Sequence, residues 1–254
     1  MPDFGQAALK VLGCSGSRFD ETFRILCSSY LVETTEVGIL LDCGFGSFES
    51  FLAYARGTVL DALVISHAHA DHVADLELFM DCSDLWRDKP KVIASEATLT
   101  QVVRDTSSFP NGTFLRAIPG VTLEHSDVFF DFSTTTHKMP TIATCVSIGN
   151  KRVAHCADTD PTWVVPENFV RADLAILECT LESREIGNVS THLDALEATD
   201  VARRLSSAHT MLTHVPPGEN SDGRFGLAST LAPETEFFHG TCRIEVGSLG
   251  ADFS

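Results

Sequence analysis

Ser66-His67-Ala68-His69-Ala70-Asp71-His72 is the stretch of sequence that decides the fold. Its first residue, Ser66, is also the last residue of Leu60–Ser66, a mostly apolar run that is typical of a strand buried on both faces. His67 and His69 lie two positions apart on the extended segment that leaves this strand, so both side chains can point to one side. The motif therefore predicts a metal site at the end of a buried strand.

Asp71 and His72 fall at the start of a helix that we expect over Val73–Met80. Adjacent side chains diverge on a helix, so this pair can face a second metal ion. The alternative is that Asp71 only caps the helix.

A hydrolytic zinc site needs about four ligands, with one position left for water. Two imidazoles are too few, so further ligands must come from later in the chain. The candidates are polar residues that stand at strand ends, where loops usually carry chemistry, namely His137, Asp158 and His214.

Strands and helices alternate along the chain, which predicts an α/β fold with sheet inside and helices outside, in a single domain over residues 1–254. The predicted strands are Ala8–Gly13, Cys27–Thr34, Gly38–Cys43, Leu60–Ser66, Lys91–Ala94, Phe114–Ile118, Val121–Glu124, Val128–Thr135, Ile142–Gly149, Arg152–Cys156, Leu174–Glu178, Thr210–Thr213 and Cys242–Val246. The predicted helices are Phe48–Ala55, Val73–Met80, Ala97–Arg104, Leu193–Leu205 and Leu227–Ala232.

The charge balance limits the substrates. The chain has 35 Asp and Glu against 18 Lys and Arg, a net charge of −17, and no run of basic residues. This disfavours large nucleic acids, but a metal centre supplies local positive charge, so small anions stay open as substrates. No apolar segment of about 20 residues predicts a membrane helix, and the first ten residues do not read as a signal peptide. The eight dispersed cysteines without C-x-x-C spacing favour reduced thiols and a cytoplasmic location.

Eight motifs in the right order carry a specific resemblance. The chain is similar to the metallo-β-lactamase superfamily, and within it to the ribonuclease Z and cyclic-nucleotide phosphodiesterase branch. The resemblance implies an αβ/βα sandwich of two mixed sheets flanked by helices. The motifs are Leu12–Gly16, Leu40–Gly44, Ser66–His72, Thr136-His137, Ala157-Asp158-Thr159, Glu178-Cys179-Thr180, Ser190–Leu193 and Leu212–His214.

The resemblance also implies a ligand set for two Zn²⁺ ions per chain, with Mn²⁺ or Fe as alternatives. One ion would be held by His67, His69 and His137, and the other by Asp71, His72 and His214. Asp158 would bridge them, because a carboxylate can span two ions about 3.5–4 Å apart. A metal-bridging hydroxide would then be the nucleophile.

The same resemblance gives roles to two further residues, His192 and Asp42, and a second role to Asp71. Asp71 and His192 are expected to take part in catalysis, His192 as a general acid or phosphate contact. The alternative for His192 is a polar residue near a helix start. Asp42 is expected to orient a ligand histidine, with an ordinary turn aspartate as the alternative.

One position departs from the family pattern. Ala157 stands where the family usually has glycine, and alanine loses easy access to positive φ, so we expect a slight shift of the Asp158 carboxylate. The Gly13–Gly16 turn is expected to be a tight turn near the site. Structural roles are expected for His125, His155, His209 and His239.

The sequence favours an enzyme that hydrolyses a small phosphodiester resembling a cyclic nucleotide. Transfer RNA processing is disfavoured, since no basic arm is present. Two alternatives stay open: a carboxylic ester, lactone or thioester hydrolase, including one in a biosynthetic pathway, and a non-catalytic binding protein stabilised by metal. No tyrosine occurs over residues 159–163, which weakens the lactonase alternative. A homodimer is common in the superfamily and is an open option here.

Overall fold

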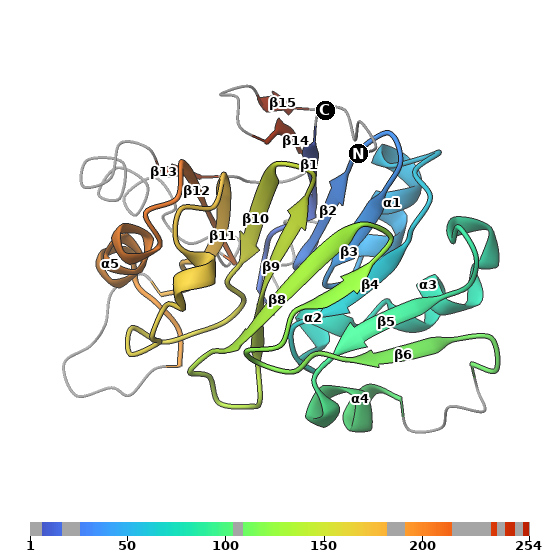
Figure 1. Ribbon diagram of the computed structural model, residues 1–254, viewed down its shortest axis with the longest axis horizontal. Coiled ribbons are helices and arrows are strands. Elements are labelled where there is room, and N and C mark those ends of the chain that lie inside the picture. The colour runs from blue at the N-terminus through green and yellow to red at the C-terminus, as the bar shows by residue number, and fades with distance from the viewer. Residues whose placement is uncertain are drawn as a thin grey trace, which may run out of the picture.

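The computed structural model describes residues 7–16, 26–103, 109–181, 191–214, 235–237, 242–246 and 251–253. Within this part of the chain, two sheets face each other across a shared apolar core, and helices cover their outer faces (Figure 1). This is the αβ/βα sandwich that the sequence predicts, and the fold prediction is confirmed.

The first sheet is antiparallel at one end and parallel at the other. Its strand order is β15-β14-β1-β2-β3-β4-β5-β6, and the pairs from β3 to β6 are parallel. The strands are β1 (Ala8–Gly13), β2 (Ser29–Glu33), β3 (Gly38–Leu41), β4 (Ala62–Ile65), β5 (Lys91–Ala94), β6 (Thr113–Arg116), β14 (Cys242–Glu245) and β15 (Ala251–Phe253).

The second sheet repeats this division. Its order is β13-β12-β11-β10-β9-β8-β7, with parallel pairs from β10 to β13. The strands are β7 (Leu123–His125), β8 (Val128–Thr134), β9 (Ile142–Ile148), β10 (Lys151–His155), β11 (Leu174–Glu178), β12 (His209–Thr213) and β13 (Thr235–Phe237).

The central strands are buried on both faces, which explains their continuous apolar runs. In β4, Val64 packs into the core between the sheets, while Leu63 packs toward the outer layer of the first sheet. In β11, Ile176 enters the core between the sheets and Leu177 packs beneath α5. Each such aliphatic side chain contributes about 1.5–3 kcal/mol by leaving water.

The helices lie in the outer layers. They are α1 (Ser47–Tyr54), α2 (Ala70–Val73), α3 (Leu76–Asp81), α4 (Glu96–Val102) and α5 (Ala195–Leu205), with short 3₁₀ turns at Ser83–Leu85 and Glu167–Phe169. A capping box fixes the start of α5, because Asp194 accepts from the Glu197 amide and the Glu197 side chain accepts from the Asp194 amide.

The prediction of one continuous helix over Val73–Met80 is wrong. The chain forms α2 and α3 there, separated by Ala74 and Asp75. The Asp75 amide donates to the Cys43 carbonyl oxygen, and the Asp75 carboxylate accepts from the Phe48 amide at 2.9 Å. These bonds tie the break to the start of α1.

The strands Ala8–Gly13, Lys91–Ala94 and Leu174–Glu178 occur with the predicted bounds, and most other predicted elements are shifted by a few residues. The helix predicted over Leu227–Ala232 lies outside the described residues. Among the helices described, none has both the length and the apolar character required to cross a membrane.

Candidate metal centre

The predicted site residues gather at one edge of the sandwich, where parallel strands end. This is the edge at which open α/β sheets generally bind ligands. The first sheet supplies Asp42 after β3 and the 66–72 segment after β4. The second sheet supplies residues after β8, β10 and β12, and the Ile142 amide donates to the Ser66 carbonyl oxygen at 3.1 Å, which joins the two sheets at this edge. The topology therefore brings together residues that are up to 147 positions apart, from His67 to His214.

The first group consists of His67, His69, His137 and Asp158, whose ligand atoms all lie within 4.8 Å of one another. His69 Nδ1 lies 2.9 Å from His67 Nε2 and 3.3 Å from His137 Nε2. Asp158 Oδ2 completes the group, 3.6 Å from His67 Nε2 and 3.8 Å from His137 Nε2.

The second group consists of Asp71, His72 and His214. His214 Nε2 lies 3.3 Å from His72 Nε2 and 3.2 Å from Asp71 Oδ2. The other oxygen of Asp158, Oδ1, lies 3.4 Å from His72 Nε2 and 3.5 Å from His214 Nε2. The structure thus brings all seven predicted ligands together, and the two oxygens of Asp158 face different groups.

Hydrogen bonds around the first sheet's histidines fix which ring nitrogen carries the proton. The Ser66 hydroxyl donates to Asp42 Oδ2 at 2.8 Å, so its oxygen accepts from His67 Nδ1 at 3.0 Å. His72 Nδ1 donates to Asp42 Oδ2 at 2.7 Å. His67 and His72 therefore both turn an unprotonated Nε2 toward the centre.

The second sheet's histidines follow the same rule. His137 Nδ1 donates to the Thr191 carbonyl oxygen at 3.0 Å. The Thr180 hydroxyl donates to Glu178 at 2.5 Å, so its oxygen accepts from His214 Nδ1 at 2.8 Å. His137 and His214 also present Nε2 to the centre.

This donor set fits a metal ion. Four imidazoles turn Nε2 toward the centre. His72 Nε2 and His214 Nε2 lie 3.3 Å apart, and two nitrogen lone pairs at this separation repel unless a cation lies between them. Imidazole and carboxylate ligands suit zinc and similar divalent ions, especially where hydrogen bonds to the other ring nitrogens orient the imidazoles. The residues present therefore fit the metal that the sequence implies.

The carboxylates of the centre are ionised at neutral pH. Burial alone would raise the pKa of Asp71. Before a metal ion binds, however, a hydrogen bond from protonated His214 and the charge of protonated His72 lower that pKa to about 2. Burial is outweighed in the same way at Asp158, where His214 and His72 hold the pKa well below the usual value. The site therefore offers negative charge to a cation.

The backbone at the centre is unusual at three non-glycine residues. Asp42, Ala157 and His214 have φ of 59°, 54° and 61°, in the left-handed region. The expectation that Ala157 loses this conformation is wrong: alanine adopts it, at a strain of about 1–2 kcal/mol. The Gly13–Gly16 turn lies against the site, and a Cβ on Gly16 would meet the His214 ring at 2.7 Å.

His192 stands at the rim, with its side chain 24% exposed. Its Nδ1 donates to Glu178 Oε1 at 2.9 Å, and its ring stacks on His214 at 5.5 Å between centroids. Burial would lower the pKa of His192, but the hydrogen bond and charge of Glu178 raise it to about 9. A proton can thus be held beside the two groups.

The local alternatives are also decided. The residue that caps α2 is His69, so Asp71 is not its N-cap. Asp42 contacts His72, as expected for an orienting residue. Of the remaining histidines, His125 contacts Lys91 and His209 begins β12, while His239 lies outside the described residues.

Three supporting residues, Ser66, Glu178 and Thr180, stand in the motifs of the sequence, but no role of their own was predicted for them. Glu178 is the most informative, because it is 2% exposed and accepts five hydrogen bonds. A glutamate that ends a fully apolar buried strand was the signal that could have identified it.

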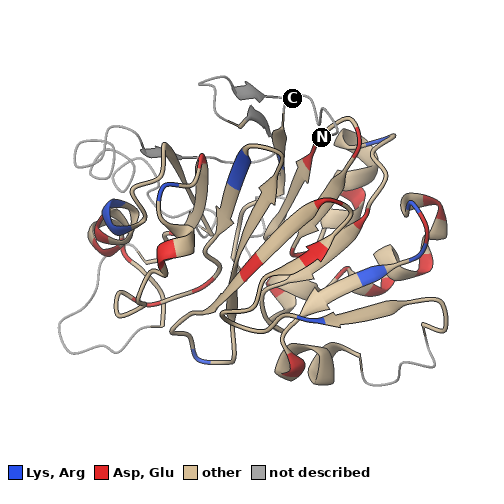
Figure 2. Ribbon diagram, viewed as in Figure 1, with Lys and Arg blue, Asp and Glu red and all other residues tan. Residues whose placement is uncertain are grey.

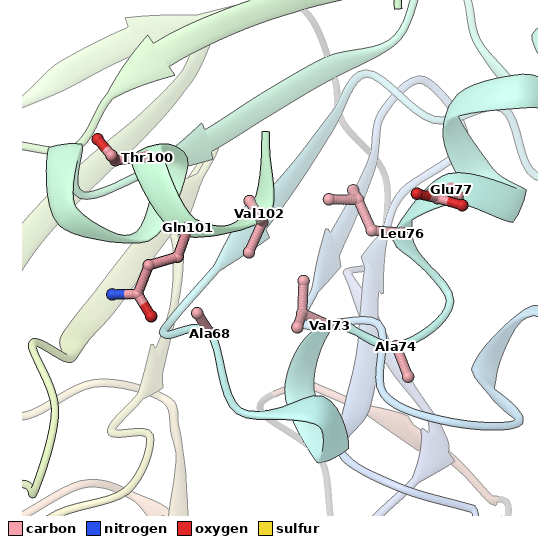
Figure 3. Close-up of a pocket in the computed structure, with 8 residues that line it drawn as sticks. All are labelled: Ala68, Val73, Ala74, Leu76, Glu77, Thr100, Gln101 and Val102. Carbon is pink, nitrogen blue, oxygen red and sulfur yellow. The ribbon is translucent and has the colours of Figure 1, made fainter. Parts of the chain in front are cut away.

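A cavity of about 490 Å³ lies beside the segment that carries the motif (Figure 3). None of its lining residues is a predicted ligand, although Ala68 lies between two of them in the sequence. The lining residues are Ala68, Val73, Ala74, Leu76, Glu77, Thr100, Gln101 and Val102.

The site and fold define a metallo-β-lactamase-type protein, and the family comparison agrees. Residues 38–215 match the model of the Beta-lactamase superfamily domain, so the chain belongs to this family. The match covers the segment from β3 to the residue after His214.

Relatives extend over most of the chain. The probable metallo-hydrolase YhfI of Bacillus subtilis (strain 168) is 26% identical over 92% of this chain and 95% of its own length. The crystal structure of YhfI superposes with a TM-score of 0.82 at 23% identity, over 95% of this chain and 100% of that one. Ribonuclease Z of Haloarcula marismortui is 24% identical over 74% of this chain and 80% of its own length. A diphosphatase from the PhnP family has the same fold, with a TM-score of 0.75 at 19% identity over 94% of this chain and 98% of that one. These relatives support a metal-dependent hydrolase.

Proposed function

We propose that this protein binds two divalent ions, zinc in the simplest case, and hydrolyses small phosphodiesters. The observation that carries the proposal is the placement of Asp158, whose Oδ2 faces one group of imidazoles and whose Oδ1 faces the other at 3.4–3.5 Å. Two-metal sites of this kind occur widely in enzymes that cleave phosphate esters.

Each group would hold one ion, with His67, His69 and His137 on one side and Asp71, His72 and His214 on the other. When bound, the ions supply a water of lowered pKa and positive charge for the phosphate oxygens. The protein keeps the imidazoles ready to bind, because Ser66, Asp42 and Thr180 hold protons on the opposite ring nitrogens.

His192 would donate a proton to the leaving oxygen. Its Nδ1 donates to Glu178, so a proton passed to the leaving oxygen would come from Nε2. Glu178 favours the protonated imidazole, and the ring lies at the rim beside His214. Asp71 stays deprotonated and would also accept hydrogen bonds from a substrate or water at the second group.

A small substrate fits the charge distribution. Figure 2 shows Lys and Arg only singly or in short pairs along the described ribbon, such as Lys151-Arg152 and Arg203-Arg204, among more numerous Asp and Glu. With a net charge of −17, the protein has little to offer a long phosphate backbone. Ribonuclease Z relatives share the fold, and the PhnP-family diphosphatase supports small phosphate substrates as the class for this chain.

The test is metal analysis and substrate hydrolysis on one preparation. We expect two equivalents of zinc or a similar ion per chain, with turnover of bis-p-nitrophenyl phosphate and of 3′,5′-cyclic AMP. Turnover of a thioester or a lactone alone would replace the phosphodiester assignment with carbonyl hydrolysis. A metal-loaded protein inactive on every substrate would favour the binding-protein alternative, and activity without metal would refute the metal-dependent mechanism.

A further inference from the structure

His155 is a buried polar residue that no role in the proposed reaction uses. It ends β10, three residues before Asp158, and is 4% exposed. Its ring packs on Tyr30, with centroids 5.4 Å apart, and its Nε2 lies 3.6 Å from Asp42 Oδ2. A histidine in such a place needs a polar partner, because burying an imidazole among apolar strands costs free energy.

His155 is not a ligand of either group. Among the described residues, the clusters of His and Asp atoms close enough to share an ion do not include it. It lies behind the centre, where a small cavity with room for about one water molecule is lined by Ser28, Tyr30, His155 and Thr213 together with residues of the site.

The carboxylate that His155 faces is heavily constrained. Asp42 is fully buried, and its Oδ1 accepts from the Ser66 amide at 2.7 Å. Its Oδ2 accepts from the Ser66 hydroxyl and from His72 Nδ1. In the described part of the chain, the basic side chains within 4 Å of the Asp42 carboxylate are the imidazoles of His72 and His155, with no Lys or Arg among them. Buried carboxylates are costly without such partners.

His155 carries a proton that suits this position. Burial, opposed in part by Asp42, lowers the pKa of His155, so the imidazole is neutral at neutral pH and has one N–H. Placing that N–H on Nε2 directs it at the Asp42 oxygen that also holds His72. The separation of 3.6 Å is an electrostatic contact rather than a hydrogen bond.

We propose that His155 is a positioning residue for the metal centre, which holds the Asp42 carboxylate toward His72 and thereby strengthens metal binding at the group formed by Asp71, His72 and His214. The inference rests on the metal binding of the proposed function, and not on its phosphodiester substrate. His155 would thus contribute to the centre without touching a metal ion: it positions Asp42, and Asp42 orients His72.

The experiment compares His155→Phe with His155→Gln in the full chain. Phenylalanine keeps a ring against Tyr30 but removes the N–H, whereas the glutamine amide can place an N–H where Nε2 stands. We expect His155→Phe to weaken one of two Zn²⁺ equivalents about 3- to 30-fold in chelator competition, a smaller loss than the 10- to 100-fold typical of groups that touch a ligand directly. The visible absorption of the Co²⁺-loaded protein should shift as well, and His155→Gln should return both values to within about threefold of wild type.

Thr144→Val is the matched control. Thr144 pairs with His155 across β9 and β10 and is 1% exposed, and among the described residues its hydroxyl finds no hydrogen-bond partner. This variant should leave metal affinity and the Co²⁺ spectrum unchanged. Wild-type affinity and spectrum in His155→Phe would overturn the inference, as would equal losses in Thr144→Val.

A measurement on the wild-type protein covers the case in which the variants fail to fold. Long-range ¹H–¹⁵N correlation spectra distinguish the two neutral tautomers of a histidine, and we expect His155 to carry its proton on Nε2. A proton on Nδ1 would refute the proposal. Wild-type protein that binds two ions but cleaves no phosphodiester would refute the proposed substrate and leave the role of His155 standing, while wild-type protein that binds no ion would refute both.

Discussion

Glu178 Oε1 lies 2.9 Å from His192 Nδ1, so a buried carboxylate holds a histidine that stands at the rim of the centre. The other oxygen of Glu178 accepts from the Thr180 hydroxyl, whose oxygen in turn accepts from His214. One side chain thus orients both a predicted proton donor and a predicted metal ligand. The following predictions separate these roles.

His192→Ala should retain both metal ions and lose activity. Removing a general acid typically costs about 10²–10⁴-fold in rate, so we expect kcat for phosphodiester cleavage to fall by that factor. Metal analysis and steady-state kinetics on the same sample test this. His209→Ala, at the opposite end of β12, is the control and should keep kcat within about twofold. Loss of metal in His192→Ala would instead make His192 a ligand.

Glu178→Gln should affect metal and rate together. The amide keeps the size of the side chain but removes its charge and one acceptor oxygen, so both His192 and the Thr180–His214 pair lose orientation. We expect zinc affinity to fall about 10- to 100-fold, as for other outer partners of ligand histidines, with a further fall in kcat at saturating zinc. Chelator competition and kinetics measure the two effects. Glu124→Gln, on the exposed side of β7, should change neither.

Asp158→Ala and His67→Ala should remove metal and activity together. Asp158 is the residue whose oxygens face both groups, so its loss should lower the metal content below one ion per chain after gel filtration. His67→Ala should release the ion of its own group. Elemental analysis measures the content, and circular dichroism checks that each variant is folded. A fully active Asp158→Ala protein with two ions would contradict the bridging role.

Ala157→Gly should stabilise the protein. Ala157 has φ of 54°, where alanine is strained by about 1–2 kcal/mol and glycine is not. The greater freedom of glycine in the unfolded chain offsets about 0.4–1 kcal/mol of this, so the free energy of unfolding should rise by up to about 1.6 kcal/mol. Urea unfolding measures it.

Two further variants serve as controls for the strain at Ala157. Ala157→Val should destabilise strongly, because a β-branched residue is disfavoured at positive φ. Ala154→Gly, in the regular part of β10, should lower stability, since glycine gains nothing there. A lower stability in Ala157→Gly than in wild type would show that the strain is absent.

His125 should make part of the stability depend on pH. Burial and the adjacent Lys91 ammonium lower the pKa of His125 below its ordinary value of 6.5. The folded state therefore binds fewer protons than the unfolded state, and stability that is present above pH 6.5 is lost as the pH falls through the folded pKa. In Lys91→Met the pKa of His125, followed by NMR titration, should rise, and in His125→Gln the difference in Tm between pH 7.5 and pH 5 should shrink. An unchanged His125 titration in Lys91→Met would contradict the assigned cause.

Much of the fold follows from local pattern. Leu174–Glu178 is a strand with the predicted bounds. A short apolar run of this length is buried on both faces only when it lies between two layers of the fold. The break between α2 and α3 could not be predicted in this way. It depends on Asp75 binding the start of α1, a contact between segments that pair only after folding.

The same division holds at the site. The histidines and aspartates of the motif are chemically conspicuous, and their spacing alone indicates a metal site. Glu178, Thr180 and Ser66 are ordinary residue types whose importance lies in the direction of single hydrogen bonds. The left-handed backbone of Ala157 was likewise misjudged, because residue preference gave the cost of the conformation but not the surrounding contacts that impose it.

The two groups of the centre draw on both sheets, and this divides the coordination sphere between the two halves of the chain. Residues up to β6 contain His67, His69, Asp71 and His72, while residues from β7 onward contain His137, Asp158 and His214. Cutting the chain at Gly120, in the turn between these strands, would give two fragments that each carry an incomplete set. On the proposed metal binding, added zinc would bind ligands from both fragments and so favour their reassociation over that driven by the shared apolar core alone.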